Sequence, residues 1–370
     1  MKKERILIVK PSSMGDIIHV FPALAFLQEK LPNASFDFVV HPAFAGILDY
    51  APVPIRRRIL FQRRKLGQVT TFPLALFQLC RELRRRRYDL VIDFQGLLRS
   101  GFCAAVTRHS RVVGFAEPRE HMTRVFYDAK IPVPGELHAV ERNLRLAAAA
   151  IGVEAPADPP RPSSSPLVRY DEKPLPEDVK PPYIVMLPGA RWHSKCFPPQ
   201  LFARIAGAVG KEHPELGFLL IGSSADHPRA ETIMGHLPKQ LRVKDLTGRT
   251  TERELVELLH GASAVVCNDT GPMHIAAMLG RPLFAFFGAT DPKRTGPWSA
   301  DAHIYTQPGL SCLGCLRRHC PKQTDGYPAC QRLDPLPIAA EINRLLDAAA
   351  PGASPRTLTT KQPTSGGQPS

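Results

Sequence analysis

The sequence predicts an α/β protein made of two parallel-sheet domains that face each other across a cleft. Short apolar runs of strand length alternate with helical patterns in both halves of the chain, which is typical of parallel sheets. Nine prolines within residues 156–182 rule out regular helix and central strand there, so we interpret this segment as a connection between domains. Small and polar residues follow several predicted strands, at the edge where open parallel sheets bind ligands.

The composition is that of a basic protein with enough apolar residues for sizeable cores. The chain has 370 residues, 44% of them hydrophobic, and a net charge of +14. This balance favours anionic partners such as phosphorylated small molecules, nucleic acid or an acidic membrane surface. No apolar run approaches the roughly 18 residues that span a bilayer, and the run at 6–9 is too short for a signal peptide. We therefore expect a cytoplasmic protein.

The first half of the chain, residues 1–170, is predicted to form one domain. Its expected strands are residues 6–9, 36–40, 90–93 and 111–114, and its expected helices run from Ile17, with a restart at Pro22, and over 74–87. Two basic clusters, 56–58 and 63–65, flank Ile59, Leu60 and Phe61. We interpret this segment either as a solvated basic loop or arginines packed on the domain surface, or as a site that binds anions and docks on a membrane, with its apolar residues dipping into the interface.

The second half, residues 171–350, repeats the alternation and is predicted to form the second domain. Its expected strands are 183–187, 218–222, 264–267 and 283–288, and its expected helices are 199–212, 252–260, 272–279 and 338–349. Residues 351–370 are rich in Pro, Ser, Thr and Gly and have few apolar side chains. We expect this tail to be disordered.

The stretch 264–274 has the pattern of a phosphate-binding turn. Apolar residues end a strand, Asn268 to Gly271 suit a tight turn, and Pro272 suits the first turn of a helix. Such a helix start presents free N–H groups and a positive dipole end. An ordinary strand-to-helix loop has the same pattern, so both interpretations stay open.

Three further loops carry residues suited to sugar and phosphate chemistry. Asp16 is either a helix cap or a carboxylate that takes a proton from a substrate hydroxyl. Arg191 and Lys195 share one loop and either bracket a diphosphate or stay solvated. Asp226 either caps a helix or accepts hydrogen bonds from sugar hydroxyls. The chain has no G-x-G-x-x-G, P-loop or Asp-x-Asp motif, which weakens a dehydrogenase, an NTPase and a metal-clamped diphosphate.

Four cysteines near the end of the second half form a candidate metal site. Cys312, Cys315, Cys320 and Cys330 lie within one short segment. Four thiolates suit tetrahedral zinc, but only one pair has the C-x2-C spacing. Structural zinc and a set of free thiols are both possible interpretations.

Several motifs occur in a fixed order along roughly residues 5–345. They are residues 10–19 with 22–24, 88–97, 117–120 with 126–128, 138–143, 187–190, 246–248, 268–274 and 288–292. Together they resemble the lipopolysaccharide heptosyltransferases, the ADP-heptose-using glycosyltransferases of family 9. The middle segments are most similar to the heptosyltransferase I branch, which adds the first heptose to Kdo on lipid A. The four-cysteine segment and a longer 191–195 loop depart from that branch.

The resemblance implies a GT-B fold of two Rossmann-like domains, with the donor bound by the second. Asp16 would be the general base for inverting attack, and Lys195 would hold the departing ADP phosphates. Donor-binding residues would be Arg191, Asp226, Thr247, Gly248, Asp269, Thr270, Gly271 and His274. Positive groups and a helix dipole would replace a catalytic metal.

The acceptor would bind to the first domain. Its expected contacts are Ser13, Gly15, Arg57, Arg63, Arg64, Gln95 and Arg119. The resulting expectation is metal-independent transfer of L-glycero-D-manno-heptose from ADP-heptose to the Kdo or inner-core region of lipopolysaccharide. The enzyme would work at the anionic inner face of the cytoplasmic membrane, without a nucleic-acid partner.

Three alternatives stay open. One is another family 9 enzyme, such as a heptosyltransferase II-like protein with a different acceptor. Another is a basic zinc-containing nucleic-acid-binding protein, although the basic segment at 56–65 has only Phe61 as an aromatic residue. The third is a non-catalytic sensor that binds ADP-heptose without turnover.

Overall fold

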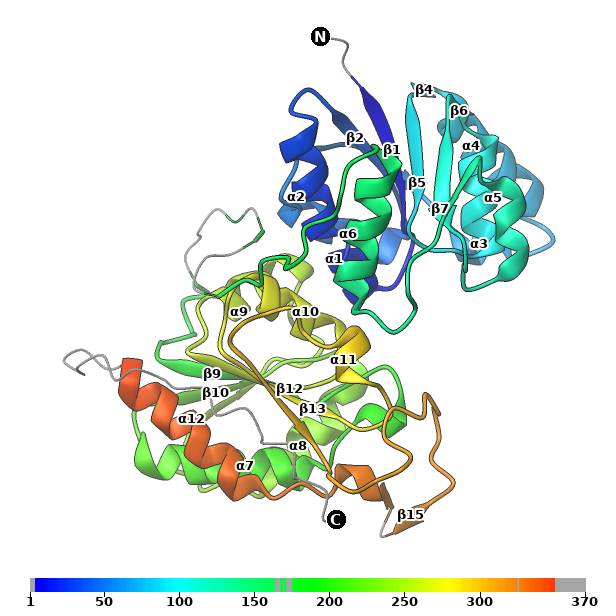
Figure 1. The fold of residues 1–370 in the computed structure, drawn as a ribbon. Helices are drawn as coiled ribbons and strands as arrows, with labels where there is room; N and C mark the ends of the chain where they lie inside the picture. The colour runs from blue at the N-terminus through cyan, green and yellow to red at the C-terminus, as the bar shows by residue number, and fades with distance from the viewer. Residues whose placement is uncertain (1–3, 164–166, 169, 171–174, 325, 350–370) are drawn as a thin grey trace, which may run out of the picture.

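The computed structural model describes residues 4–163, 167–168, 170, 175–324 and 326–349, which form two α/β domains (Figure 1). Each domain contains a six-stranded sheet whose neighbouring strands all pair in parallel. The predicted fold class is therefore confirmed. The domain boundary near residue 170 stays a prediction, and the predicted tail at 351–370 lies outside the described residues.

The N-terminal sheet reverses its strand order at its centre. Across the sheet, the strands are β3 (Ile55–Leu60), β2 (Ser35–Val40), β1 (Arg5–Val9), β5 (Leu90–Asp93), β7 (Val112–Phe115) and β8 (Ala129–Ile131). Side chains of β1 alternate between two buried clusters, with Ile6 and Ile8 in one and Leu7 and Val9 in the other. The reversal between β1 and β5 is the switch point at which such sheets bind ligands.

Helices cover both faces of the N-terminal sheet (Figure 1). They are α1 (Met14–Ile18), α2 (Phe21–Lys30), α3 (Arg63–Leu66), α4 (Phe72–Arg84), α5 (Leu98–Val106) and α6 (Ala139–Ala150). Apolar residues of α2 and α6 join one core cluster, and those of α4 and α5 join the other. A small pair, β4 (Arg87–Tyr88) and β6 (Arg108–His109), lies beside the main sheet.

The first helix begins earlier than the sequence predicts. We expect a helix from Ile17, but α1 begins at Met14, because Ser13 serves as its N-cap and Asp16 occupies its third position. The predicted restart is confirmed, since α2 begins at Phe21 and has Pro22 in its first turn.

The basic segment after β2 forms a strand and a short helix instead of a loop. Its first part is β3, the edge strand of the N-terminal sheet, and residues 63–65 open α3. Arg56, Arg58, Arg63, Arg64 and Lys65 are exposed. Ile59 and Phe61 are only 2% and 6% exposed, because they pack into the core beneath α4. The prediction that these two side chains reach a membrane interface is therefore wrong, whereas Leu60 is exposed.

The C-terminal sheet repeats the same topology. Its strand order is β11 (Arg242–Asp245), β10 (Gly217–Leu220), β9 (Tyr183–Leu187), β12 (Ala264–Asn268), β13 (Leu283–Phe287) and β14 (Ala302–Thr306). Its helices are α7 (Pro199–Glu212), α8 (His227–Gly235), α9 (Glu252–His260), α10 (Gly271–Met278), α11 (Pro292–Thr295) and α12 (Pro335–Ala349), and a short hairpin joins β15 (Gln323–Thr324) to β16 (Tyr327–Pro328). The bounds of α7 and α9 agree with those predicted.

The two domains touch directly through α1 and α10. A Cβ atom on Gly15 would lie 2.4 Å from the His274 ring, and one on Gly271 would lie 3.0 Å from the sulfur of Met14. One buried apolar cluster also runs through both domains. Across the described residues, no helix is long and apolar enough to cross a membrane.

Candidate active site

The carboxyl edges of the two sheets face each other across a cavity of about 540 Å³. Met14 and Ala43 line it from the N-terminal domain, and Gly189, Arg191 and Thr270 are among the residues that line it from the C-terminal domain. The contributing loops follow β1, β2, β9 and β12, so the cavity lies at the switch points of both sheets. This position fits a ligand held between the domains.

Asp16 lies at the start of α1 in a capping box with Ser13. Its Oδ2 atom accepts hydrogen bonds from the Ser13 amide at 2.8 Å and the Ser13 hydroxyl at 2.7 Å. The residue is therefore a first-turn carboxylate whose orientation is held by its own cap. Capping and a catalytic role are compatible here, because both bonds use one of the two oxygens.

Buried charge around Asp16 keeps its carboxylate ionised. Burial raises the pKa of Asp16, but Lys10 and the two Ser13 hydrogen bonds outweigh it, so the net pKa lies below its ordinary value. Lys10 is itself buried and donates to the Phe94 carbonyl at 2.8 Å. Its pKa is lowered, first by burial, against the opposing charges of Asp16 and Asp93.

Lys195 is held by Asp269 on the opposite side of the cleft. Its ammonium donates to Asp269 Oδ2 at 2.6 Å, and the Thr290 hydroxyl donates to the same oxygen. The ammonium also lies 4.9 Å from the centre of the Trp192 ring. Lys195 is thus positioned at the end of the loop after β9 by one charge and one aromatic face.

The start of α10 supplies a second positive feature beside Lys195. Thr270 is the N-cap in extended conformation, and Gly271 opens the helix. Thr270, Pro272 and the exposed Arg191 line the cavity. A helix start, an arginine and a nearby lysine together suit a diphosphate.

Asp226 lies on the floor of the cavity, in a second capping box. Its Oδ2 accepts from the Ser223 amide at 2.8 Å and the Ser223 hydroxyl at 2.7 Å. A Cβ on Gly189 would lie 2.2 Å from Asp226 Oδ1, so only glycine lets this carboxylate reach the loop after β9. The arrangement repeats that of Ser13 and Asp16 in the other domain.

Thr247 and Gly248 hold the neighbouring turn. The Thr247 hydroxyl donates to Asp245 Oδ1 at 2.6 Å, and its amide donates to the same oxygen at 2.8 Å. Gly248 has a φ of +70° and packs against Ser224. Their direct donor contact stays a prediction, and neither residue is among those that line the cavity.

A buried histidine cluster lies where the domains meet. The ring of His19 lies 4.4 Å from that of His274 and 5.2 Å from that of His138. Neither ring nitrogen of His19 has a hydrogen-bond partner among the described residues. Burial, followed by His138 and Lys195, lowers the pKa of His274 to about 3. His274 therefore packs on Gly15 as a neutral side chain.

The predicted acceptor residues separate into two groups. The pKa of Arg99 is lowered first by burial, and the charges of Arg63 and Arg119 lower it further. Gln95 lies elsewhere in the group, with its Oε1 atom 3.4 Å from the Ser12 amide. Arg57 instead pairs with Glu82 at 2.7 Å and lies 3.6 Å from Asp37. The charges of Arg63 and Arg119 thus both reach Arg99. Arg64 lies on exposed α3, and Arg57 is occupied by other partners.

Arg99 is a candidate site residue that the sequence analysis missed. It occupies the second position of α5, where a cation is unfavourable to the helix dipole. The sequence signal that could have identified Arg99 was a basic residue at this unfavourable helix position, directly after the 88–97 motif.

The cysteine segment supports the loop that carries Lys195. Ser194 Oγ donates to the Arg317 carbonyl at 2.6 Å, and the Gln331 amide donates to the Ser194 carbonyl at 2.9 Å. All four cysteines are free thiols, and burial, followed by the charges of the other three, raises the pKa of Cys330 to about 11. In the part of the chain described, no three His, Cys, Asp or Glu side chains are arranged to hold a metal ion.

Two parallel-sheet domains, with a carboxylate on one side of the cleft and a lysine and helix start on the other, define a GT-B glycosyltransferase. The model of glycosyltransferase family 9 (heptosyltransferase) matches residues 76–324. The chain belongs to this family, so the predicted resemblance and enzyme class are confirmed.

Relatives of known name agree with this assignment. The chain is 32% identical to lipopolysaccharide heptosyltransferase 1 of Pseudomonas aeruginosa, over 92% of this chain and 98% of that protein. It is 28% identical to lipopolysaccharide heptosyltransferase 2 of Escherichia coli K12, over 81% and 87%. E. coli heptosyltransferase WaaC with ADP matches with a TM-score of 0.69 and 26% identity, over 81% of this chain and 92% of that chain.

Proposed function

We propose that the protein transfers L-glycero-D-manno-heptose from ADP-heptose to the Kdo or inner-core region of lipopolysaccharide, with inversion and without a catalytic metal. The observation that carries the proposal is the cavity between the domains, which Met14 of α1 lines on one side and Thr270 and Pro272 at the start of α10 line on the other. Asp16 lies on the same short helix as Met14, and Lys195 pairs with Asp269, the residue before Thr270. Support comes from the names of the relatives and from WaaC, whose structures hold ADP and ADP-2-deoxy-2-fluoro heptose.

The donor binds to the C-terminal domain in this proposal. Arg191, Lys195 and the first amides of α10 take the diphosphate, and Asp226 takes hydroxyls of the donor. Asp269 and Thr290 hold the lysine in place before the donor arrives. The positive groups then stabilise the charge that develops on the departing ADP.

Asp16 is the base on the other side of the cleft. Its lowered pKa leaves it ionised at neutral pH, as proton removal requires. It takes the proton of the acceptor hydroxyl while that oxygen bonds to the anomeric carbon. The bond from this carbon to the diphosphate breaks on the opposite face, and ADP leaves with the electron pair.

The acceptor binds to the N-terminal domain. The charges of Arg63 and Arg119 both act on Arg99, and a group of arginines suits carboxylates and phosphates. The identity to heptosyltransferase 1 exceeds that to heptosyltransferase 2, so we favour Kdo on lipid A as the acceptor. The enzyme would then meet its substrate at the inner face of the cytoplasmic membrane.

Transfer assays read by mass spectrometry test the proposal. Purified protein is incubated with ADP-heptose and either Kdo-lipid A or the singly heptosylated acceptor. A single heptose added only to Kdo-lipid A supports the proposed acceptor. Addition only to the heptosylated acceptor would favour the heptosyltransferase II-like alternative, and binding without turnover on either acceptor would favour a sensor.

Structural zinc at the four cysteines is a separate proposal. Its support is their placement within residues 312–330 and their closeness to one another, since the charges of the other three thiols act on Cys330. Zinc binding would require the segment to close further, because thiolate sulfurs lie about 2.3 Å from zinc. One zinc per chain by elemental analysis would support it, and metal-free active protein would contradict it.

A further inference from the structure

Helix α4 presents apolar side chains to the solvent as well as to the core. Ala75, Leu79 and Leu83 form its buried side. On the opposite side, Leu74 is 63% and Phe77 is 62% exposed. The spacing of three residues puts both on one face of the helix, where burial in the core does not account for them.

The apolar character continues into the connection before α4. Val69 is 91% exposed and Phe72 is 43% exposed. Large apolar side chains that gather on one surface mark an interaction site more often than single ones do. We name the exposed surface of residues 63–85 the α3–α4 face.

The same face is strongly basic. Residues 63–85 contain six lysines and arginines and a single acidic residue, Glu82, which pairs with Arg57 and Arg85. Arg81 and Arg84 follow Leu74 and Phe77 along the exposed side of α4. Arg63, Arg64 and Lys65 are exposed on α3.

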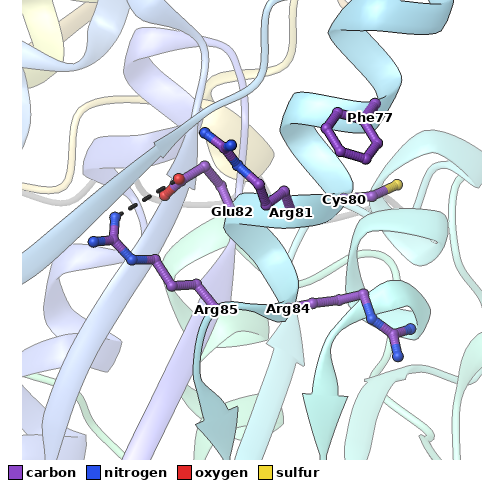
Figure 2. Close-up of a pocket in the computed structure, with 6 residues that line it drawn as sticks. All are labelled: Phe77, Cys80, Arg81, Glu82, Arg84 and Arg85. Atoms are coloured by element: carbon purple, nitrogen blue, oxygen red, sulfur yellow. Dashed lines mark ion pairs between the residues drawn. The ribbon is translucent and has the colours of Figure 1, made fainter.

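A shallow hollow joins the apolar and basic parts of the face. Figure 2 shows its lining on and just after α4, with the ion pair of Glu82 and Arg85 dashed. Its volume is about 680 Å³, and its lining is Phe77, Cys80, Arg81, Glu82, Arg84 and Arg85. Aromatic and guanidinium groups at one hollow suit an amphiphile with an anionic head.

The α3–α4 face lies beside the route to the acceptor site. Helix α3 follows the carboxyl end of β3, and this edge of the sheet also carries the loop of Asp16. Arg63 belongs to the face and acts on Arg99 at the acceptor site. A membrane in contact with the α3 end of the face would therefore lie next to that site.

We propose that the enzyme docks on an anionic phospholipid membrane through the α3–α4 face. Val69, Leu74 and Phe77 enter the interface, while the arginines of α3 and α4 bind lipid phosphates. The basic residues favour an anionic partner. The exposed apolar side chains favour a membrane over a partner held by charge alone. The inference rests on the proposed function, because a lipid-linked acceptor is what makes docking useful.

Vesicle sedimentation with the full chain tests this docking directly. Vesicles of phosphatidylcholine alone are compared with vesicles that also contain about one third phosphatidylglycerol, at low and high salt. We expect binding to the anionic vesicles and weak binding to the neutral ones, with salt reducing it. Leu74→Ser with Phe77→Ser, and separately Arg81→Gln with Arg84→Gln, should each weaken anionic-vesicle binding at least tenfold.

The matched control is Met234→Ser with Ile304→Ser, which removes two exposed apolar side chains of the C-terminal domain. It should bind vesicles as the unmodified protein does, and all variants should keep their melting temperatures and their turnover of a deacylated acceptor. Unchanged binding by both α4 variants, an equal loss in the control, or binding of RNA but no vesicles would overturn the proposal. Vesicle binding needs no sugar donor or acceptor. Failure of docking can therefore be distinguished from failure of heptose transfer, because each is measured without the other.

Discussion

The ammonium of Lys195 lies 2.6 Å from Oδ2 of Asp269, and that oxygen also accepts from Thr290. The lysine is thus held beside the helix start before any diphosphate is present. Its partner is 7% exposed, so the pair is shielded from solvent and from salt screening. A diphosphate that binds here would be a second anion beside the Lys195 ammonium. The Lys195 side chain would not have to become ordered on binding.

Lys195→Ala should therefore impair use of ADP-heptose strongly. Loss of one preorganised group at a leaving group costs about 10²–10³ in rate, and we expect a loss of that size in kcat/KM for the donor. Steady-state kinetics with varied ADP-heptose measure it. Lys244→Ala is the control. It removes a lysine of the edge strand β11 that pairs with Asp178, and it should have no effect.

EDTA should leave turnover unchanged. Recovery of activity that depends on Mg²⁺ after chelation would contradict a metal-independent mechanism.

Asp16→Asn should abolish most turnover while ADP binding stays intact. A general base contributes about 10²–10⁴-fold, and the amide retains the size of the carboxylate without its basicity. Turnover and calorimetric ADP binding are measured together. Asp226→Asn is matched in geometry, since it has the same capping box in the other domain, and should alter the donor KM more than kcat. If Asp16→Asn keeps more than about a tenth of the unmodified turnover rate, Asp16 acts only as a helix cap.

Ser13→Ala should shift the acid limb of the activity profile to higher pH. The Ser13 hydroxyl donates to Asp16 and helps to lower the pKa of that carboxylate. Removing the donor disfavours the ionised form, so the pKa of Asp16 rises. A pH profile of kcat over pH 4–8 detects the shift. An unchanged limb would show that another group limits activity at low pH.

The buried histidines should make folding stability fall as the pH drops below about 6.5. Burial lowers the pKa of His19 and His138 as well as that of His274, which lies at about 3. Lys10, Lys195 and Arg161 lower these pKa values further, while Asp16 and Glu141 oppose them. Between these native pKa values and the unfolded one, the unfolded chain binds more protons, so acid favours unfolding.

Urea denaturation at pH 5, 6 and 7 measures this dependence. Each such histidine contributes up to about 1.4 kcal/mol per pH unit, and His274→Gln should reduce the slope by about one proton. His236→Gln, at the exposed end of α8, serves as the control. Equal slopes for His274→Gln and the unmodified protein would contradict a neutral His274.

Gln331→Leu should raise the KM for the sugar donor, although we propose no contact between Gln331 and the donor. It removes the hydrogen bond from the Gln331 amide to Ser194, next to Lys195. A single such bond is worth about 1 kcal/mol, so the donor KM should rise about fivefold while the acceptor KM stays constant. Thr232→Ala loses a hydrogen bond of similar length within α8 and should change neither constant. A rise in both KM values would indicate general destabilisation instead.

The sequence by itself determined the features that depend on neighbouring residues. The strand, turn and helix start at 264–274 follow from apolar residues, small turn residues and Pro272, and they are present as β12 and α10. The alternation of strands and helices determined the fold class, and α7 and α9 have their predicted bounds. Local propensity and periodicity suffice there, because each signal lies within one element.

Only the tertiary structure decided which distant side chains meet. It pairs Arg57 with Asp37 and Glu82, and it buries Ile59 and Phe61 under α4. It also brings His19, His138 and His274 together across the domain interface. None of these contacts has a signature in local sequence, because burial and pairing of a charged or aromatic side chain depend on the packing of strands and helices far apart in the chain.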